Sequence, residues 1–240
     1  MKNLPIDAIW VRKWKYQTVN GQRTRFVKSR LCARGFLDAQ GKSLTTRATT
    51  ATRLSQRLVA SLSVILGFDL GTWDASGAFL KGFPFPEVEA RLKAKGYTAP
   101  KRQVSTRPPA NVWRDLRNMK DSGIHVADSE TYWYVLKLLK AMYGLNDAPL
   151  AWQLALAEYF VQRRNAHKSV FDDCFFFWVK RPGEILAIGA SHVDDNAMAA
   201  SKKWLNTEFN AFDKQFRGAT RPGLPFTHTG IVYRDIKRGR

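Results

Sequence analysis

Two adjacent aspartates, Asp194 and Asp195, are the most chemically suggestive pair in this 240-residue sequence. They lie between two apolar runs, 184–193 and 197–200, a pattern typical of a β-hairpin with the aspartates at its turn. Two carboxylates about 4 Å apart repel by roughly 4 kcal/mol at an effective dielectric of about 20. Solvent removes most of that cost at an ordinary turn, and a divalent cation between the carboxylates would also offset it. From the turn alone, both interpretations stay open.

The composition narrows the class of protein. Hydrophobic residues make up 45% and charged residues 25% of the chain, which is typical of a globular protein and not of a disordered one. The net charge of +19 favours a polyanionic partner, nucleic acid before membrane. No apolar run reaches the roughly 18 residues of a membrane span, and the first ten residues lack a signal-peptide core. We therefore expect an intracellular protein, cytoplasmic or nuclear, without a membrane partner.

Positive charge is concentrated in the first part of the chain. Residues 1–72 hold 13 Lys or Arg against three Asp or Glu. Strand-like alternation over 8–34 surrounds Asn20-Gly21, a pair typical of a two-residue hairpin turn. One face of the returning strand is largely cationic, and is either a solvated sheet edge or a phosphate-binding surface. That face carries Lys28, Arg30, Cys32 and Arg34.

The middle of the chain alternates between helix and strand patterns. An amphipathic helix packed on a sheet is predicted within 50–68 and is expected to end at Gly67. Asp74 closes a short strand, and the stretch 91–130, rich in Lys, Arg, Pro and Gly, predicts an irregular, basic and exposed excursion. The residues at helical spacing in the predicted helix are Leu54, Leu58, Leu62 and Ile65.

The second half of the chain continues this alternation. Residues 131–142 predict a buried strand or a short helix, and Pro149 in a first turn predicts the helix that follows. A buried strand is predicted at 170–179, ahead of the aspartate hairpin. After the hairpin we expect a helix capped by Ser201 and a last short strand at 230–236.

Four segments occur in a characteristic order. They are VKSRLCARGF at 27–36, WDASGAFLKG at 73–82, LLKAMYGLNDAPLAW at 138–152 and HVDDNAMAA at 192–200. Together they resemble the reverse transcriptase of copia-type long-terminal-repeat retrotransposons, and HTGIVY at 228–233 is similar to the family's primer-grip strand. The resemblance covers almost the whole chain, and chance would rarely place a YGL-x-x-AP-x-AW segment between the two aspartate segments.

The resemblance implies an α/β (α+β) right-hand polymerase fold. Fingers, a hairpin and a helix, would occupy about 1–72, and a palm, an antiparallel sheet backed by helices, would occupy about 73–240, with the basic excursion at 91–130 inside it. The thumb, connection and RNase H regions are expected to be absent. The expected partners are an RNA template, a DNA primer, deoxynucleoside triphosphates and, in a polyprotein, other Pol regions.

The resemblance also implies an activity, RNA-directed DNA polymerisation, and a set of site residues. Asp74, Asp194 and Asp195 would hold two Mg²⁺ ions, or Mn²⁺, that stabilise the attacking and leaving oxygens. Phe79 is either a steric gate that selects deoxynucleotides or a core aromatic residue. Lys28 and Arg30 match positions that hold the incoming triphosphate.

Three positions depart from the family pattern. His192, expected near the primer end, replaces a Tyr, and Asp147 replaces a Gln that contacts the incoming nucleotide. A carboxylate close to a triphosphate is unfavourable by Coulomb repulsion. Leu150 replaces a basic residue of the family pattern. Gly230 lies in the segment that is similar to the family's primer-grip strand. The alternative function is therefore a truncated, catalytically impaired retroelement remnant that binds nucleic acid non-specifically.

Overall fold

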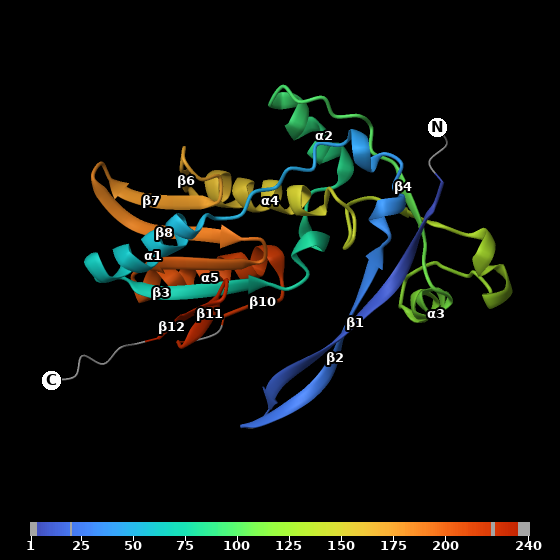
Figure 1. Ribbon diagram of the computed structural model, residues 1–240, viewed down its shortest axis with the longest axis horizontal. Coiled ribbons are helices and arrows are strands. Elements are labelled where there is room, and N and C mark those ends of the chain that lie inside the picture. Colours follow the sequence, from blue (N-terminus) through green and yellow to red (C-terminus); the bar gives the residue numbers. More distant parts are fainter. Residues whose placement is uncertain (1–3, 20, 222–223, 235–240) are drawn as a thin grey trace. The chain divides into compact units, whose positions relative to one another are not determined.

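The computed structural model describes residues 4–19, 21–221 and 224–234. It contains helices and mostly antiparallel strands, which confirms the mixed α/β class (Figure 1). The chain divides into two compact units, each assembled from two separate stretches, whereas the predicted division followed the chain at residue 72. Unit 1 comprises Met1–Thr46 and Phe83–Ala151, and unit 2 comprises Arg47–Gly82 and Trp152–Arg240.

Unit 1 is built on a sheet with the strand order β2-β1-β4-β5. β1 (Ile6–Val19) and β2 (Gln22–Ala33) pair antiparallel along their whole length, which confirms the predicted hairpin. β4 (Val104–Arg107) runs parallel to β1 and pairs only with its first residues. β5 (Leu136–Leu138) closes the sheet antiparallel to β4. The hairpin is therefore anchored at its base and extends as a two-stranded ribbon (Figure 1).

The stretch 91–130 is more regular than we predicted. α2 (Phe85–Ala94) ends inside it, and α3 (Ala110–Asn118) and the start of η4 (Asp128–Trp133) lie within it. The prediction of an irregular excursion was wrong because β4 is only four residues long and its partner strand begins about 100 residues earlier. Local periodicity cannot detect so short a strand.

Residues 131–142 are also not the buried element that we predicted. They contribute the end of η4 and the three residues of β5, and most of their large side chains are exposed. Trp133 is 79% exposed and Leu139 is 72% exposed. The prediction was wrong because apolar side chains are buried only where another element packs over them, and the sequence of the run does not show whether one does.

The YGL segment of unit 1 packs directly on the end of β2. The backbone N–H of Ala33 donates to the carbonyl of Tyr143 at 2.7 Å. Gly144 has a φ of +91°, and a Cβ there would lie 2.0 Å from the carbonyl oxygen of Ala33. Only glycine fits this conformation and this close approach. The segment therefore holds the hairpin base in place.

Unit 2 is built on an antiparallel sheet with the strand order β10-β3-β9-β8-β7-β6. β11 (Phe226–His228) and β12 (Ile231–Tyr233) form a separate hairpin, and residues 235–236 of the predicted last strand lie outside the described residues. The six strands, in chain order, are β3 (Asp69–Ala75), β6 (His167–Lys168), β7 (Phe175–Arg181), β8 (Glu184–His192), β9 (Asp195–Ala200) and β10 (Ala219–Thr220).

Helices cover both faces of this sheet. α1 (Arg53–Ile65) packs on one face, where Val59 meets side chains from β8 and β9. The other face carries α5 (Lys202–Phe216), which the hydroxyl of Ser201 caps as predicted, and the end of α4 (Ala148–Glu158) with its π-helical turn, Tyr159–Arg163. None of the described helices is long and apolar enough to cross a membrane.

The buried face of α1 differs from the predicted one. The helix does end before Gly67, as expected, but Leu54 is 76% exposed and Ile65 is 74% exposed. The residues turned inward include Ser55, whose hydroxyl donates to Asp172 at 2.5 Å. Polar side chains with internal partners can be buried at little cost, and these contacts set the rotation of the helix. The predicted strand at 170–179 likewise begins later, at Phe175, because Val170 and Phe171 are exposed.

Candidate active site

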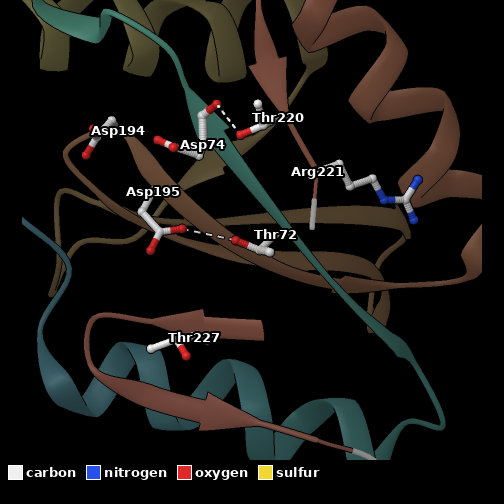
Figure 2. Close-up of a pocket in the computed structure, with 7 residues that line it drawn as sticks. All are labelled: Thr72, Asp74, Asp194, Asp195, Thr220, Arg221 and Thr227. Atoms are coloured by element: carbon white, nitrogen blue, oxygen red, sulfur yellow. Dashed lines mark hydrogen bonds between the residues drawn. The ribbon is translucent and has the colours of Figure 1, made fainter. Parts of the chain in front are cut away.

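One cavity in unit 2 contains the three aspartates that the sequence singled out. It has a volume of about 600 Å³, and its wall comes from β3, β9, β10, β11 and the turns beside them (Figure 2). Asp74 is exposed at the cavity, and Asp194 and Asp195 are half-buried. The residues that line it are Thr72, Asp74, Asp194, Asp195, Thr220, Arg221 and Thr227.

The pairing of β3 with β9 brings the aspartates together. The two strands run antiparallel from the pair Asp69 and Ala200 to the pair Asp74 and Asp195. The backbone N–H of Ala75 then donates to the carbonyl of Asp194 at 2.9 Å. Residues about 120 positions apart in the sequence thus meet at one end of these two neighbouring strands.

The hairpin turn lies one residue earlier than predicted. The turn residues are Val193 and Asp194, and Asp195 is already the first residue of β9, paired with His192. Val193 has a φ of +58°, a left-handed conformation that is unfavourable for a β-branched residue. A positive φ at the first central position is what a two-residue type II′ turn requires. The turn therefore places Asp194 at its tip and Asp195 on the strand.

Two buried side chains that sequence reasoning missed hold this turn. The indole N–H of Trp152, in the helix signature, donates to the carbonyl of Val193 at 2.6 Å. The side chain of Asn196 is fully buried, and its amide N–H donates to the carbonyl of Asp194 at 3.2 Å. The Ser191 hydroxyl donates to the side-chain oxygen of Asn196 at 2.6 Å. A polar residue directly inside an apolar strand is the signal that could have identified Asn196.

The carboxylate of Asp195 is turned toward two partners within unit 2. The Thr72 hydroxyl donates to its Oδ1 at 3.0 Å (Figure 2). Nδ1 of His228 lies 2.9 Å from its Oδ2. The ring is not aligned for a hydrogen bond to this carboxylate, and neither of its nitrogens has a hydrogen-bond partner among the residues that the structure describes. His228 is fully buried.

A hairpin anchored on α1 places His228 beside Asp195. The turn between β11 and β12 consists of Thr229 and Gly230, both with positive φ, the combination of a type I′ turn. The Thr229 hydroxyl donates to the side-chain oxygen of Gln56 at 2.5 Å. Nearby, burial and the charge of Asp195 raise the pKa of Tyr233. Gly230 is therefore a turn residue of the β11–β12 hairpin.

The chemistry of the three carboxylates fits Mg²⁺ or Mn²⁺, which take oxygen ligands. Their arrangement fits less well. Among the residues that the structure describes, no three His, Cys, Asp or Glu side chains come close enough together to hold a metal ion. A cation that took Asp195 as a ligand would compete with Thr72 and His228 for it. Arg221, a cation in the cavity wall, extends away from the carboxylates (Figure 2). Its guanidinium donates to the side chain of Asn206.

Two further candidate residues lie in the same unit. His192 is the last residue of β8 and half-buried, and its Nδ1 atom has no hydrogen-bond partner within the described part of the chain. Phe79 lies in the short helix η3 (Ala78–Lys81), five residues after Asp74, and packs partly buried against the core cluster around Trp152. Its ring is thus partly a core aromatic.

The candidates Lys28 and Arg30 belong to unit 1, on the β2 strand of the hairpin. Lys28 is exposed, and Arg30 is half-buried with its guanidinium carbon 5.4 Å from the centre of the Tyr143 ring. They share a face with Cys32, as the period of two predicted.

Asp147, also in unit 1, is buried in an ion network. Nε of Arg102 donates to its Oδ2 at 2.8 Å, and Nη2 of Arg102 donates to Asp38 at 2.5 Å. Nη1 of Arg102 also donates to the side-chain oxygen of Gln40 at 3.2 Å. Burial lowers the pKa of Arg102, but the hydrogen bonds and charges of the two aspartates outweigh it and raise the pKa. The carboxylate of Asp147 is thus neutralised inside its own unit.

Comparison with known proteins places the chain near one retroelement protein. Over 191 residues, 79% of this chain, it is 27% identical to a retrovirus-related Pol polyprotein from transposon RE1 of Arabidopsis thaliana. This similarity supports an origin in a retrotransposon Pol polyprotein. The chain spans about 11% of the length of that relative. No protein-family model matches the chain.

Proposed function

We propose that this chain carries the fingers and palm of a retrotransposon reverse transcriptase, an RNA-directed DNA polymerase. The observation that carries the proposal is the antiparallel pairing of β3 and β9, which gathers Asp74, Asp194 and Asp195 at one cavity. Oxygen donors at the end of adjacent strands are what nucleotidyl transfer requires, since the reaction depends on positioning and on stabilising charge. The similarity to a Pol polyprotein and the net charge of +19 also support the proposal.

The residues of the chain would divide the work as follows. Asp74, Asp194 and Asp195 would hold Mg²⁺ or Mn²⁺, which stabilises the attacking and leaving oxygens of the transfer. Lys28 and Arg30 would attract the triphosphate of the incoming deoxynucleotide. Basic residues elsewhere on the chain would hold the phosphates of the RNA template and the DNA primer.

Primer extension tests the proposal directly. With a poly(A) template, an oligo(dT) primer and dTTP, we expect extension in Mg²⁺ or Mn²⁺, and Asp74→Asn or Asp194→Asn should abolish it. Asp69→Asn is the matched control, because Asp69 is exposed on the same strand, β3, at the end away from the cavity. Absence of extension by the parent chain under every cation condition would refute the activity. Equal loss in the control would refute the site.

Phe79 provides a second test of the same proposal. If its ring blocks the ribose 2′-OH, Phe79→Ala should raise the incorporation of ribonucleotides relative to deoxynucleotides. Because the ring also packs against the core, the variant is compared with Leu80→Ala, a neighbouring exposed side chain on the same short helix. A general loss of both substrates would instead indicate a packing role.

A second candidate function is nucleic-acid binding without catalysis. The engagement of Asp195 by Thr72 and His228 favours it, since this leaves the three carboxylates unable to converge as they stand. This function predicts sequence-independent binding that weakens strongly between about 50 and 200 mM salt, with no extension. Binding that stays constant over that range would contradict it.

A further inference from the structure

The outer part of the β1–β2 hairpin exposes two large aromatic side chains on one of its faces. Trp14 is 58% exposed and Tyr16 is 56% exposed. On β2, the residues from Gln22 to Ser29 are exposed except for the half-buried Phe26. A two-stranded ribbon is only marginally stable in water, and such side chains contribute little to its stability while they face solvent. The composition of this ribbon therefore points to a partner outside the unit.

The register sorts the ribbon side chains into two faces. On one face, the guanidinium carbon of Arg25 lies 4.0 Å from the centre of the Trp14 ring, and that of Arg23 lies 4.1 Å from the centre of the Tyr16 ring. Each arginine reaches its ring diagonally across the strands. We call these four residues the aromatic face. Cation–π stacking holds both rings in place, while more than half of each residue's surface stays open.

The opposite face carries three lysines at the same level of the ribbon, together with the half-buried Phe26, which pairs with Lys15. Lys13 of β1 pairs directly with Lys28 of β2, and Lys15 follows two residues after Lys13. Like charges directly opposite each other destabilise a strand pair. We call these three residues the lysine face. An anionic partner would remove the repulsion, so the charge of this face favours a phosphate backbone.

We propose that the aromatic face binds the bases of single-stranded nucleic acid by stacking, and that the lysine face attracts the phosphates of the same strand. Indole, phenol and guanidinium planes all stack on unpaired bases, and this stacking tolerates any sequence. Paired bases inside a duplex present no free ring face, so the aromatic face selects single strands. The inference deepens the proposed function and rests on it for the identity of the strand, a template, but the binding itself requires no cation.

Fluorescence anisotropy in EDTA tests the proposal with three probes of about 12 nucleotides, a length within the range that such sites cover. The probes are a single-stranded RNA, the same RNA in a duplex, and an abasic phosphodiester strand. The double variant Trp14→Ala/Tyr16→Ala should lose about tenfold or more in affinity for the RNA strand, and little for the other two. Trp14→Phe/Tyr16→Phe should retain most of the affinity.

A matched variant of the lysine face separates charge from stacking. Lys13→Gln/Lys15→Gln should lower the affinity for the RNA strand and for the abasic strand by the same factor. It should also reduce the slope of log affinity against log salt by about 1.4, since each phosphate contact on a single strand contributes about 0.7. The aromatic variant should leave that slope unchanged. Both pairs lie on exposed ribbon positions, so circular dichroism should show both variants folded.

Two outcomes would overturn the inference. One is equal affinity of the parent chain for the RNA strand and the abasic strand, because stacking would then contribute nothing. The other is a loss of affinity in Trp14→Ala/Tyr16→Ala that is as large for the duplex as for the single strand. Asp194→Asn should bind the RNA strand like the parent chain, so failure of primer extension and failure of stacking remain distinguishable.

Discussion

Both units of the protein gather aspartates, but in different surroundings. In unit 1, Asp38 and Asp147 share one guanidinium, that of Arg102, and all three side chains are less than 10% exposed. In unit 2, three aspartates line an open cavity, and the partners of Asp195 there are the Thr72 hydroxyl and an imidazole. Carboxylates that a buried guanidinium neutralises stabilise a fold, whereas carboxylates at a cavity can still attract a cation.

The comparison also concerns Asp147, which departs from the family pattern. The sequence suggested a carboxylate facing the nucleotide, which would repel a triphosphate. The structure instead shows this carboxylate bonded to Arg102 inside unit 1, so its charge is balanced. The partner of Asp147, Arg102, lies in the stretch 91–130. That stretch carries many basic residues, and the local sequence does not indicate which of them is buried.

The largest expected effect is on the stability of unit 1. Arg102→Met leaves Asp38 and Asp147 buried without a cation, and removing one partner of a buried pair costs about 3–5 kcal/mol. Urea unfolding measures the loss. Arg107→Met is the control, since its ion pair with Asp7 is 3.9 Å long and 40–46% exposed, and such pairs contribute about 0–1 kcal/mol. An Arg102 variant as stable as the control would remove the distinction between the two aspartate groups.

Asp172 in unit 2 sharpens the comparison, because hydrogen bonds replace the guanidinium. Burial raises its pKa, but donors from Ser55, Thr52 and Cys174 outweigh burial and lower it. A lowered folded pKa means that the stabilisation is complete above the unfolded value, about 3.9, and is lost as pH falls through the folded pKa. Asp172→Asn should therefore cost about 1–3 kcal/mol at pH 7 and progressively less below about pH 4.

Urea unfolding of the parent and of Asp172→Asn at a series of pH values measures this dependence. Asp173→Asn is the control, because the neighbouring Asp173 is exposed and pairs with an exposed lysine, Lys168. A stability difference that stayed constant from pH 7 to pH 3 would show that the charge of Asp172 is not what stabilises the start of α1.

His228 tests whether the cavity aspartates are held back from a cation. His228→Leu removes the imidazole ring, whose Nδ1 lies next to Oδ2 of Asp195. We expect Mn²⁺ to bind about tenfold more tightly, equivalent to roughly 1.4 kcal/mol. Titration followed by electron paramagnetic resonance of free Mn²⁺ measures the change. His167→Leu, a change of an exposed ring stacked on Phe177, should have no effect on Mn²⁺. Unchanged or weaker binding by His228→Leu would contradict the competition.

The smallest effect concerns the strained turn beside the cavity. At most β positions Ala is more stable than Gly, but Val193 has a φ of +58°, where Gly pays no steric cost. Val193→Gly should therefore unfold with a free energy about 1 kcal/mol higher than Val193→Ala. Both variants lose the same packing of the Val side chain against the core, so their difference isolates the backbone conformation. Thermal unfolding in which Ala proves more stable would rule out strain at this turn.

Much of the local structure could be predicted. The alternating strands of the first hairpin, the start of α5 at Ser201 and the end of α1 before Gly67 follow from short-range rules, and the structure confirms them. Asn20, in the predicted turn of that hairpin, lies outside the described residues. Errors arose where a partner far along the chain decided the outcome. β4 pairs with a strand about 100 residues earlier, and α1 is rotated by contacts to Asp172.

The sequence alone determined which residues are available for chemistry. It contained the aspartate pair, the third aspartate and the cationic hairpin, because residue types, turn signals and periodicities are local properties of a chain. Only the tertiary structure decided what each carboxylate does. The register of β3 against β9 brings Asp74 to Asp195, and the hairpin of β11 and β12 brings His228 to the same carboxylate. Such pairings depend on packing between distant segments, which no local pattern specifies.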